Sequence, residues 1–243
     1  QRFAKDFKDS LSIELPALMD FFDKIFKRTP NLPSTFKWYE KCLEQNHNKK
    51  ALNEIRFVVI DTETTGLNPA TDRILSIGAV EVINYNIVID NSFETVLQQQ
   101  HNNTSAIHIH EITPSTSALG AEKKQVFHDF LTFIDDSILI GHNIGFDFAI
   151  LNHAYQRSFG FSLLNKTYDT VNLIKRVDTH FSQPGMFNSA ELSLESLCER
   201  YAVEINDRHT AMGDAMATAL LFTKLLKKLE HRGIKNGKQL LSR

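Results

Sequence analysis

The run IRFVVID at residues 55–61 is the feature of this sequence that most constrains its fold. Such a nearly continuous apolar run predicts a central strand that is covered on both faces. Asp61 and Glu63 follow at its end, and the alternation of side chains along a strand makes both point the same way. Two carboxylates so close together repel each other unless a cation lies between them. The pair therefore predicts a metal site at the end of a buried strand.

The patterns after this strand predict an α/β fold with a mixed sheet. Residues 71–84 and 85–97 alternate as strands do, with Asn84-Tyr85-Asn86 as the hairpin turn between them. Residues 137–143 and 166–170 predict two further short strands. Helical patterns occupy residues 125–134, 146–159, 171–177, 191–201 and 214–230, and Gly160 ends the second of these.

The first fifty residues differ from the rest and predict a helical extension over residues 1–52, followed by the main domain over residues 53–243. Apolar residues recur every three or four positions from Phe3 to Phe26, and residues 37–45 predict a second short helix. Residues 45–50 are a polar linker candidate. The extension either packs on the main domain or offers a surface to a protein partner.

Composition excludes several classes of protein. The 243 residues are 42% hydrophobic and 23% charged, which is ordinary for a globular chain. No apolar run approaches the roughly 20 residues that a membrane span needs, and the N-terminal residues lack a secretory pattern. Two distant cysteines, Cys42 and Cys198, favour a reducing compartment, so we expect a cytoplasmic protein without a membrane partner. The net charge of −2 does not announce a nucleic-acid partner.

Two further acids are placed to join the first pair. Ligand sites in open α/β sheets lie beyond the carboxyl ends of strands, where Asp61 and Glu63 stand. Asp147 follows the fourth predicted strand, and Asp214 lies early in the last long helix. Either acid alone also suits a helix N-terminus. Together, the four oxygen ligands favour two Mg²⁺ or Mn²⁺ ions, a pair that can clamp the attacking and leaving oxygens of a phosphoryl displacement. His209, on a loop before Asp214, is suited to deprotonating a water molecule.

Three motifs in the sequence resemble those of a known enzyme family. FVVIDTETTGL, GHNIGFDFAIL and RHTAMGDA stand in the order of the exonuclease motifs of the DEDDh (DnaQ-like) 3′–5′ exonucleases. This group includes the proofreading epsilon subunit of bacterial DNA polymerase III. The resemblance covers roughly residues 55 to 230. It implies an RNase H-like fold with a five-stranded mixed sheet flanked by helices.

The resemblance also assigns roles to residues of this chain. It makes Asp61, Glu63, Asp147 and Asp214 the metal ligands and His209 the general base. The substrate-binding residues that it implies are Thr64, Thr65, Gly66, Leu67, His110, His142 and Asn143. Glu111 stands where glycine is usual in the family, so the sequence departs from the family pattern beside His110. Asp169 reads as a supporting residue outside the catalytic set.

The activity that follows is stepwise hydrolysis of phosphodiester bonds at a DNA 3′ end, releasing nucleoside 5′-monophosphates in proofreading or repair. Single-stranded DNA is the favoured substrate. One rival is an RNA-directed exonuclease or oligoribonuclease, because the motifs read phosphates and metals rather than the 2′-hydroxyl. Another is a non-catalytic binding scaffold, which need not keep an intact set of acids. A zinc site formed by His101, His108 and His110 is disfavoured, since no cysteine completes it.

Basic residues gather near both ends of the chain and have two readings. The C-terminal group includes Lys224, Lys227 and Lys228, and a smaller group around Lys27 and Lys49 lies near the front. Such runs usually form a solvated helix face. Contact with a nucleic-acid backbone is the second reading.

Overall fold

The computed structural model describes residues 34–44, 47–99, 120–183, 185 and 187–242. The described residues from Thr35 onward belong to one compact unit. Its strands are β1 (Phe57–Thr64), β2 (Ile74–Ile83), β3 (Asn86–Val96), β4 (Ile138–Gly141) and β5 (Thr167–Asp169). Its α-helices are α3 (Ser34–Cys42), α6 (Lys123–Ile134), α7 (Gly145–Phe159), α8 (Thr170–Val177), α9 (Leu194–Arg200), α10 (Ala211–His231) and α11 (Gly237–Leu241).

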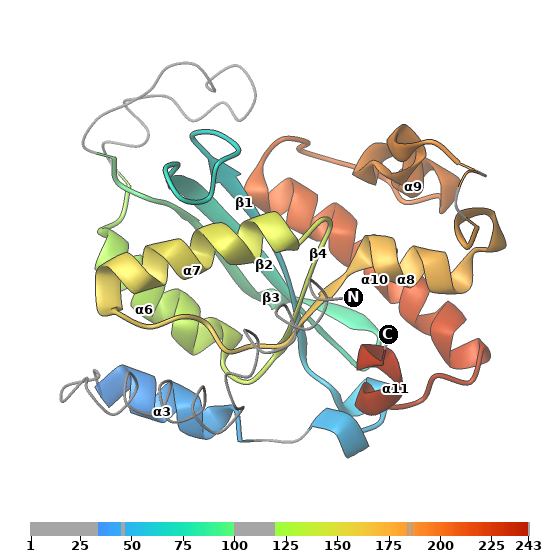
Figure 1. Ribbon diagram of the computed structural model, residues 1–243, viewed down its shortest axis with the longest axis horizontal. Helices are drawn as coiled ribbons and strands as arrows, with labels where there is room; N and C mark the ends of the chain where they lie inside the picture. Colours follow the sequence, from blue (N-terminus) through green and yellow to red (C-terminus); the bar gives the residue numbers. More distant parts are fainter. Residues whose placement is uncertain (1–33, 45–46, 100–119, 184, 186, 243) are drawn as a thin grey trace, which may run out of the picture. The chain divides into compact units, whose positions relative to one another are not determined.

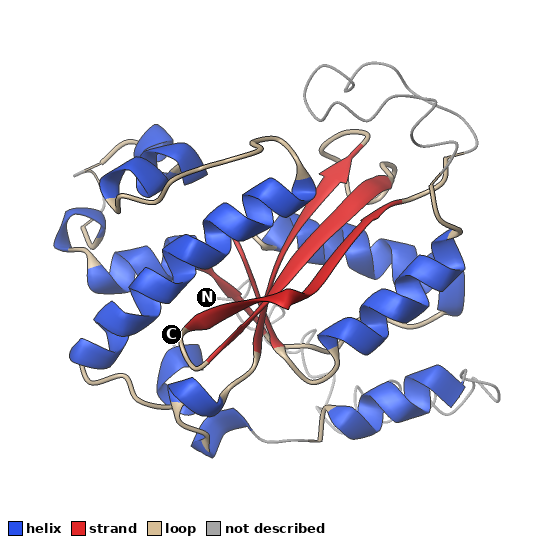
Figure 2. Cartoon of the chain, turned by 180° about the vertical axis from the view of Figure 1, so that it is seen from behind, coloured by secondary structure: helices blue, strands red, loops and turns tan. Residues whose placement is uncertain are grey.

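The five strands form one mixed sheet in the order β3-β2-β1-β4-β5, as predicted. β1 and β3 run antiparallel to β2, whereas β4 is parallel to both β1 and β5. Asn84 and Tyr85 join β2 to β3 with φ angles of 50° and 60°. Positive φ at both positions is the geometry of a two-residue hairpin turn whose twist matches that of the strands. Helices lie on both sides of the sheet (Figures 1 and 2).

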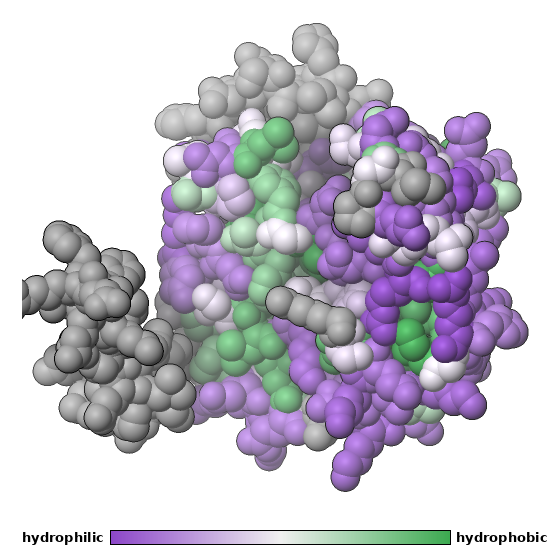
Figure 3. Space-filling view, turned by 45° about the vertical axis from the view of Figure 1, so that its right-hand side comes forward, coloured by the Kyte–Doolittle hydropathy of each residue, from purple (hydrophilic) through white to green (hydrophobic). Residues whose placement is uncertain are grey.

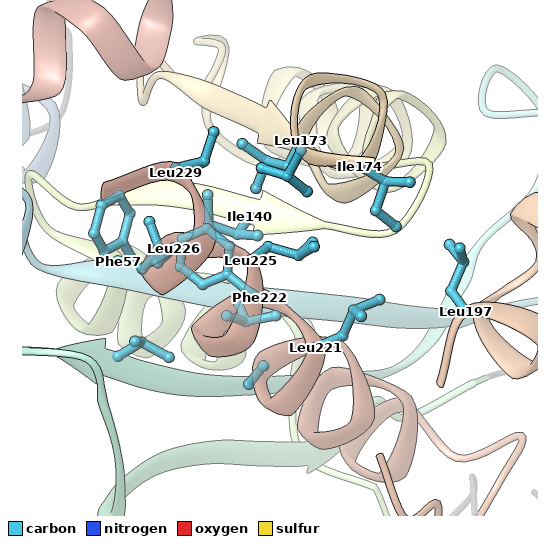
Figure 4. Packing of buried hydrophobic residues seen from close by; sticks show 14 of the residues in the cluster. Phe57, Ile140, Leu173, Ile174, Leu197, Leu221, Phe222, Leu225, Leu226 and Leu229 are labelled. Atoms are coloured by element: carbon cyan, nitrogen blue, oxygen red, sulfur yellow. The ribbon is translucent and has the colours of Figure 1, made fainter. Parts of the chain in front are cut away.

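The larger core lies between the sheet and α10. Phe57 and Val59 of β1 belong to this cluster, while their neighbours Val58 and Ile60 are buried outside it. Alternate residues of β1 therefore face opposite helix layers, which confirms the prediction of a strand covered on both faces. The ring of Phe57 meets Phe222 of α10 edge-on, with centroids 5.1 Å apart (Figure 4). Each fully buried side chain of this size contributes about 1.5–3 kcal/mol.

The other face of the sheet is covered by α6 and α7. Phe93 of β3 packs against Phe130 of α6 with ring centroids 5.3 Å apart. Phe127 of α6 and Tyr155 of α7 are at the same separation, and the Tyr155 hydroxyl donates to the Phe127 carbonyl at 2.7 Å. α7 ends at Gly160, whose φ of 77° is the left-handed conformation expected at that position.

Helix α3 packs against the segment that follows α7. Tyr39 is fully buried, and its hydroxyl accepts the Leu164 N–H at 2.7 Å and donates to the Asn165 side chain. Phe36 packs on Phe161 with centroids 4.6 Å apart. The helix begins at Ser34 rather than at the predicted residue 37. Phe36 is buried, so the buried face of α3 starts before the predicted first residue. Residues 1–33 lie outside the described residues, so an extension ending at residue 52 stays a prediction.

The surface carries few large apolar side chains in the part of the chain that the structure describes. Trp38, Leu67, Ile89 and Leu164 are the exposed ones. The face seen in Figure 3 is mostly hydrophilic, apart from a strip of hydrophobic residues left of its centre and a smaller hydrophobic patch to the right. No described helix has the length and apolar character to cross a membrane.

Candidate active site

The pairing of β1 with the parallel strand β4 ends just before the two acids. β4 pairs only with residues 57–59 of β1, whereas β2 stays paired along the whole strand. The carboxyl end of β1 is therefore open on one side, where open α/β sheets bind their ligands. Asp61 and Glu63 lie in this stretch, in register with Gly78 and Ser76 of β2.

Gly78 allows the first turn of α10 to lie directly on the sheet. A Cβ at Gly78 would be 2.3 Å from the carbonyl carbon and oxygen of Ala211, so no larger residue fits there. Thr210 caps the helix, and its hydroxyl accepts the Gly213 N–H at 3.0 Å. This packing brings Asp214, in the first turn, to the face of β1 that carries the acid pair.

Three of the predicted ligands form a single group. Asp61, Glu63 and Asp214 each offer a carboxylate oxygen, and these atoms lie within 4.8 Å of one another. All three side chains are partly buried. A group of hard oxygen donors fits Mg²⁺ or Mn²⁺ better than the softer metals.

Asp147, the fourth predicted ligand, reaches the same place from the other helix layer. It lies in the first turn of α7 and is 6% exposed. Its Oδ1 accepts both the N–H of Thr62 at 3.0 Å and the Thr62 hydroxyl at 2.7 Å. Thr62 points away from its neighbours Asp61 and Glu63 by strand alternation. Asp147 therefore lies beside the group of three rather than within it.

Burial raises the pKa values of Asp61, Glu63 and Asp147, and the repulsion of neighbouring acids adds to this for Asp61 and Glu63. Burial, and then the charges of Asp147, Asp214 and Glu63, hold the pKa of Asp61 well above its ordinary value. Burial followed by the charges of Asp214 and Asp147 raises the pKa of Glu63 to about 7. Burial raises the pKa of Asp147 to about 6, although its bonds from Thr62 act in the opposite direction. A bound cation would relieve this cost of ionisation.

Arg208 is a cation that contacts this group. Its Nη1 donates to Asp214 and its Nη2 donates to Glu195 at the start of α9. The Nε of Arg208 is buried and has no hydrogen-bond partner among the described residues. The guanidinium thus partly neutralises Asp214 and ties the loop before α10 to α9.

His209 lies on the loop before α10, as predicted. Its φ is 61°, and Asp207 has a φ of 52° in the same loop. The loop lies directly against α10 at Gly213. A Cβ at this position would be 2.0 Å from the Asp207 carbonyl oxygen, so glycine permits the close approach. The imidazole of His209 is exposed and forms no hydrogen bond or ion pair with the residues that the structure describes. Its role as general base stays a prediction.

The predicted substrate segment leaves the end of β1 and folds back on itself. The Thr64 hydroxyl donates to the Gly66 carbonyl at 2.7 Å, and the Thr65 hydroxyl donates to Asp72 at 2.9 Å. A Cβ at Gly66 would lie 2.7 Å from the Asp72 carboxylate, so glycine permits this close turn. Leu67 is 88% exposed, which leaves its apolar side chain accessible to a ligand.

The remaining predicted residues are only partly described. His142 is held by a hydrogen bond of 2.9 Å between its Nδ1 and the Thr170 hydroxyl, and burial lowers its pKa. Asn143 is exposed with a φ of 57°, and its N–H donates to Asp169 at 3.2 Å. Asp169 also caps α8 by accepting the Val171 N–H, and its supporting role in the site stays a prediction. His110, with His101 and His108, lies outside the described residues.

Comparison with known proteins identifies the family. Residues 58–222 match the RNase_T family, whose description is Exonuclease. The chain belongs to this exonuclease family. The DNA polymerase III PolC-type protein of Staphylococcus epidermidis is 31% identical over 188 residues, which cover 76% of this chain. That of Staphylococcus aureus is 30% identical over 192 residues, or 78% of this chain. The match covers only 12% of the length of either relative.

Solved structures support the fold of this exonuclease domain. Escherichia coli exonuclease I in complex with a dT13 oligonucleotide matches with a TM-score of 0.62 and 18% identity. The match covers 74% of this chain and 43% of that one. A zinc-bound complex of the same enzyme with single-stranded DNA has a TM-score of 0.61, with 19% identity over 74% and 42% of the two chains. The RNase H-like fold implied by the motifs is therefore confirmed.

Several residues around the site were not singled out from the sequence. Thr62, which binds Asp147, stands between two acids, and alternation along β1 was a signal that it faces the other way. Arg208 and Glu195 are far apart in sequence from the first acids, and only Arg208 had a signal, its position beside His209. Gly78 gave no signal, because its close contact with Ala211 exists only in the folded chain.

Proposed function

We propose that this domain removes nucleotides one at a time from DNA 3′ ends and releases nucleoside 5′-monophosphates. The group of carboxylates at Asp61, Glu63 and Asp214 is the single observation that carries the proposal. The raised pKa values of Asp61 and Glu63 support it, because acids held at such cost are typical of cation and catalytic sites.

The proposed cofactors are two Mg²⁺ or Mn²⁺ ions. Asp61, Glu63 and Asp214 would hold one, and Asp147, aligned by Thr62, would help to hold the other. Such ions supply charge stabilisation to the attacking and leaving oxygens of a phosphodiester. Thr62 keeps the Asp147 carboxylate oriented toward the site through its two hydrogen bonds.

The protein's own groups position the nucleotide and move the proton. His209 accepts the proton of the attacking water, a role for which an imidazole is suited near neutral pH. The segment 64–67 lies along the terminal nucleotide, with exposed Leu67 available to its base. His142 and Asn143 support the loop beside Asp147.

DNA is the proposed substrate because the related proteins are a DNA polymerase and a nuclease solved with DNA oligonucleotides. The relatives from Staphylococcus are named DNA polymerase III PolC-type, and exonuclease I was solved with dT13 and dA16 oligonucleotides. A DNA polymerase is accordingly the proposed partner, with proofreading or repair as the setting.

The test is digestion of 5′-labelled single-stranded DNA, mismatched duplex and RNA with Mg²⁺, with Mn²⁺ and with chelator. Asp214→Asn should lower kcat by at least ~1,000-fold, since several kcal/mol of charge stabilisation are lost. Asp90→Asn, which removes an exposed acid from β3, is the matched control and should retain full activity. Equal cleavage in chelator would contradict the metal mechanism, and a strong preference for RNA would contradict the DNA assignment.

A further inference from the structure

A basic cavity lies on the α6 and α7 side of the sheet. It has a volume of about 160 Å³ and is lined by residues at the start of β2, directly after β3, and on α6 and α7. Phe127 and Ile150 supply part of its apolar lining. Its polar lining includes Asp72, Arg73, Lys123, His153 and Arg157.

The cations of this cavity lack charged partners. In the part of the chain that the structure describes, Arg73, Lys123 and Arg157 form no ion pair. Lys123 donates to the amide oxygen of Gln99 at 3.2 Å, and Arg157 donates to the Ala70 carbonyl at 2.7 Å. Both partners are neutral, so they satisfy donors without cancelling charge.

Asp72 is the carboxylate in the lining, and its oxygens are already engaged. One accepts the Thr65 hydroxyl at 2.9 Å and the other accepts the Asn68 N–H at 2.8 Å. With three cations against this one carboxylate, the cavity lining keeps an excess of positive charge in a protein whose net charge is −2. Burial, and then the like charge of Arg73, lower the pKa of Lys123, which is the effect that a missing counter-charge produces.

The cavity adjoins the segment that the proposed function places along the terminal nucleotide. The Arg73 N–H donates to the Thr65 hydroxyl at 3.0 Å, and the Thr65 N–H donates to the Arg73 carbonyl at 3.0 Å. Thr65 therefore connects the substrate segment to a lining residue of the cavity. The substrate segment therefore leads directly to Arg73, one of the three cations that line the cavity.

We propose that this cavity binds a phosphate group of the substrate strand, upstream of the 3′-terminal nucleotide. This inference rests on the proposed function, because the ligand is taken to be the same nucleic acid. Guanidinium and ammonium donors around a small cavity suit a phosphodiester, and its charge balances theirs. The apolar lining excludes water from beneath the phosphate and strengthens the attraction.

The test is equilibrium binding of a labelled oligodeoxythymidine octanucleotide and of a dinucleotide, measured by fluorescence anisotropy in chelator so that no hydrolysis occurs. The variant Arg73→Gln/Lys123→Gln/Arg157→Gln should weaken octanucleotide binding by at least ~10-fold. It should also reduce the slope of log K against log salt by about 0.7, the value for one single-strand phosphate. Dinucleotide binding should not change, since a dinucleotide ends before the cavity.

The matched control is Lys37→Gln/Lys41→Gln/Lys175→Gln, which removes three exposed lysines from α3 and α8. It should change octanucleotide affinity by less than about 2-fold. An equal loss in both triple variants, or no loss in the cavity variant, would overturn the proposal. If the cavity variant is not folded, Arg73→Gln alone decides, because that side chain is exposed and has no partner among the described residues.

A second arm separates the strand from free phosphate. Calorimetry with inorganic phosphate and with thymidine monophosphate should show no cavity-dependent binding at concentrations where the octanucleotide saturates. If phosphate binding is lost in the cavity variant while octanucleotide binding is retained, the ligand is a free anion and the strand assignment is wrong. If the wild-type protein hydrolyses no DNA in Mg²⁺ yet binding falls as expected, the proposed function fails and the cavity site stands.

Discussion

Removing the charge of Glu63 should stabilise the metal-free protein while it abolishes activity. The pKa of Glu63 is about 7, against an ordinary value of 4.5. Because the folded state binds the proton more tightly than the unfolded state, the free energy of unfolding falls as pH rises from 4.5 to 7. The loss of stability that ionised Glu63 causes is absent well below pH 4.5 and complete well above pH 7.

The magnitude follows from the two pKa values. Their difference of about 2.5 corresponds to roughly 3.4 kcal/mol at 1.36 kcal/mol for each pKa unit. Glu63 is partly exposed, and solvent screening reduces this to about 1–2 kcal/mol. At pH 8 in chelator, Glu63→Gln should therefore raise the melting temperature by roughly 2–8 °C for a chain of this size.

Thermal unfolding at pH 4 and pH 8, with chelator or with excess Mg²⁺, is the assay. The gain should vanish at pH 4, where the carboxyl is protonated in both states. Mg²⁺ should reverse the order at pH 8, because ligand binding stabilises the wild-type protein by about 2.7 kcal/mol at 100 times Kd. Glu199→Gln, an exposed acid on α9, is the control and should change nothing. A variant that is no more stable than wild type at pH 8 in chelator, or whose gain persists at pH 4, would refute the reasoning.

Three further predictions follow from individual contacts. Thr62→Val removes the hydroxyl that donates to Asp147, so the pKa of Asp147 should rise. The pH at which the protein gains metal affinity should therefore rise by about one unit in calorimetric titrations. Thr62→Ser keeps the hydroxyl and should keep the wild-type value. Gly213→Ala should lower the free energy of unfolding in urea by about 1–3 kcal/mol, because its Cβ clashes with the Asp207 carbonyl. Gly145→Ala, which has open space around it, should not lower it. A Gly213 variant that is more stable than wild type would contradict this packing. Tyr39→Phe leaves the N–H groups of residues 164 and 165 unpaired and should lower the free energy of unfolding by about 1–3 kcal/mol. Limited proteolysis should then cleave the variant near α3 earlier than wild type. An unchanged urea midpoint would show that these hydrogen bonds of the Tyr39 hydroxyl do not stabilise the fold.

Local patterns were enough to predict the elements and the candidate ligands. The apolar run of β1 and the Asn84-Tyr85 turn each express a property of a few adjacent residues, and both agree with the structure. The same holds for Gly160 at the end of α7. The motifs added the order of the elements, so the mixed five-stranded sheet and the family were also predictable.

By itself, the sequence determined that Asp61 and Glu63 share a face, since a strand alternates with a period of two. Only the tertiary structure decided which face the other acids use. Asp214 joins the pair because Gly78 allows α10 to touch β2, while Asp147 comes from the opposite helix layer and is held by Thr62. These arrangements depend on contacts between residues far apart in the chain, and their geometry is set by how whole helices pack on the sheet. No local pattern encodes such packing, so it emerges only when the chain is folded.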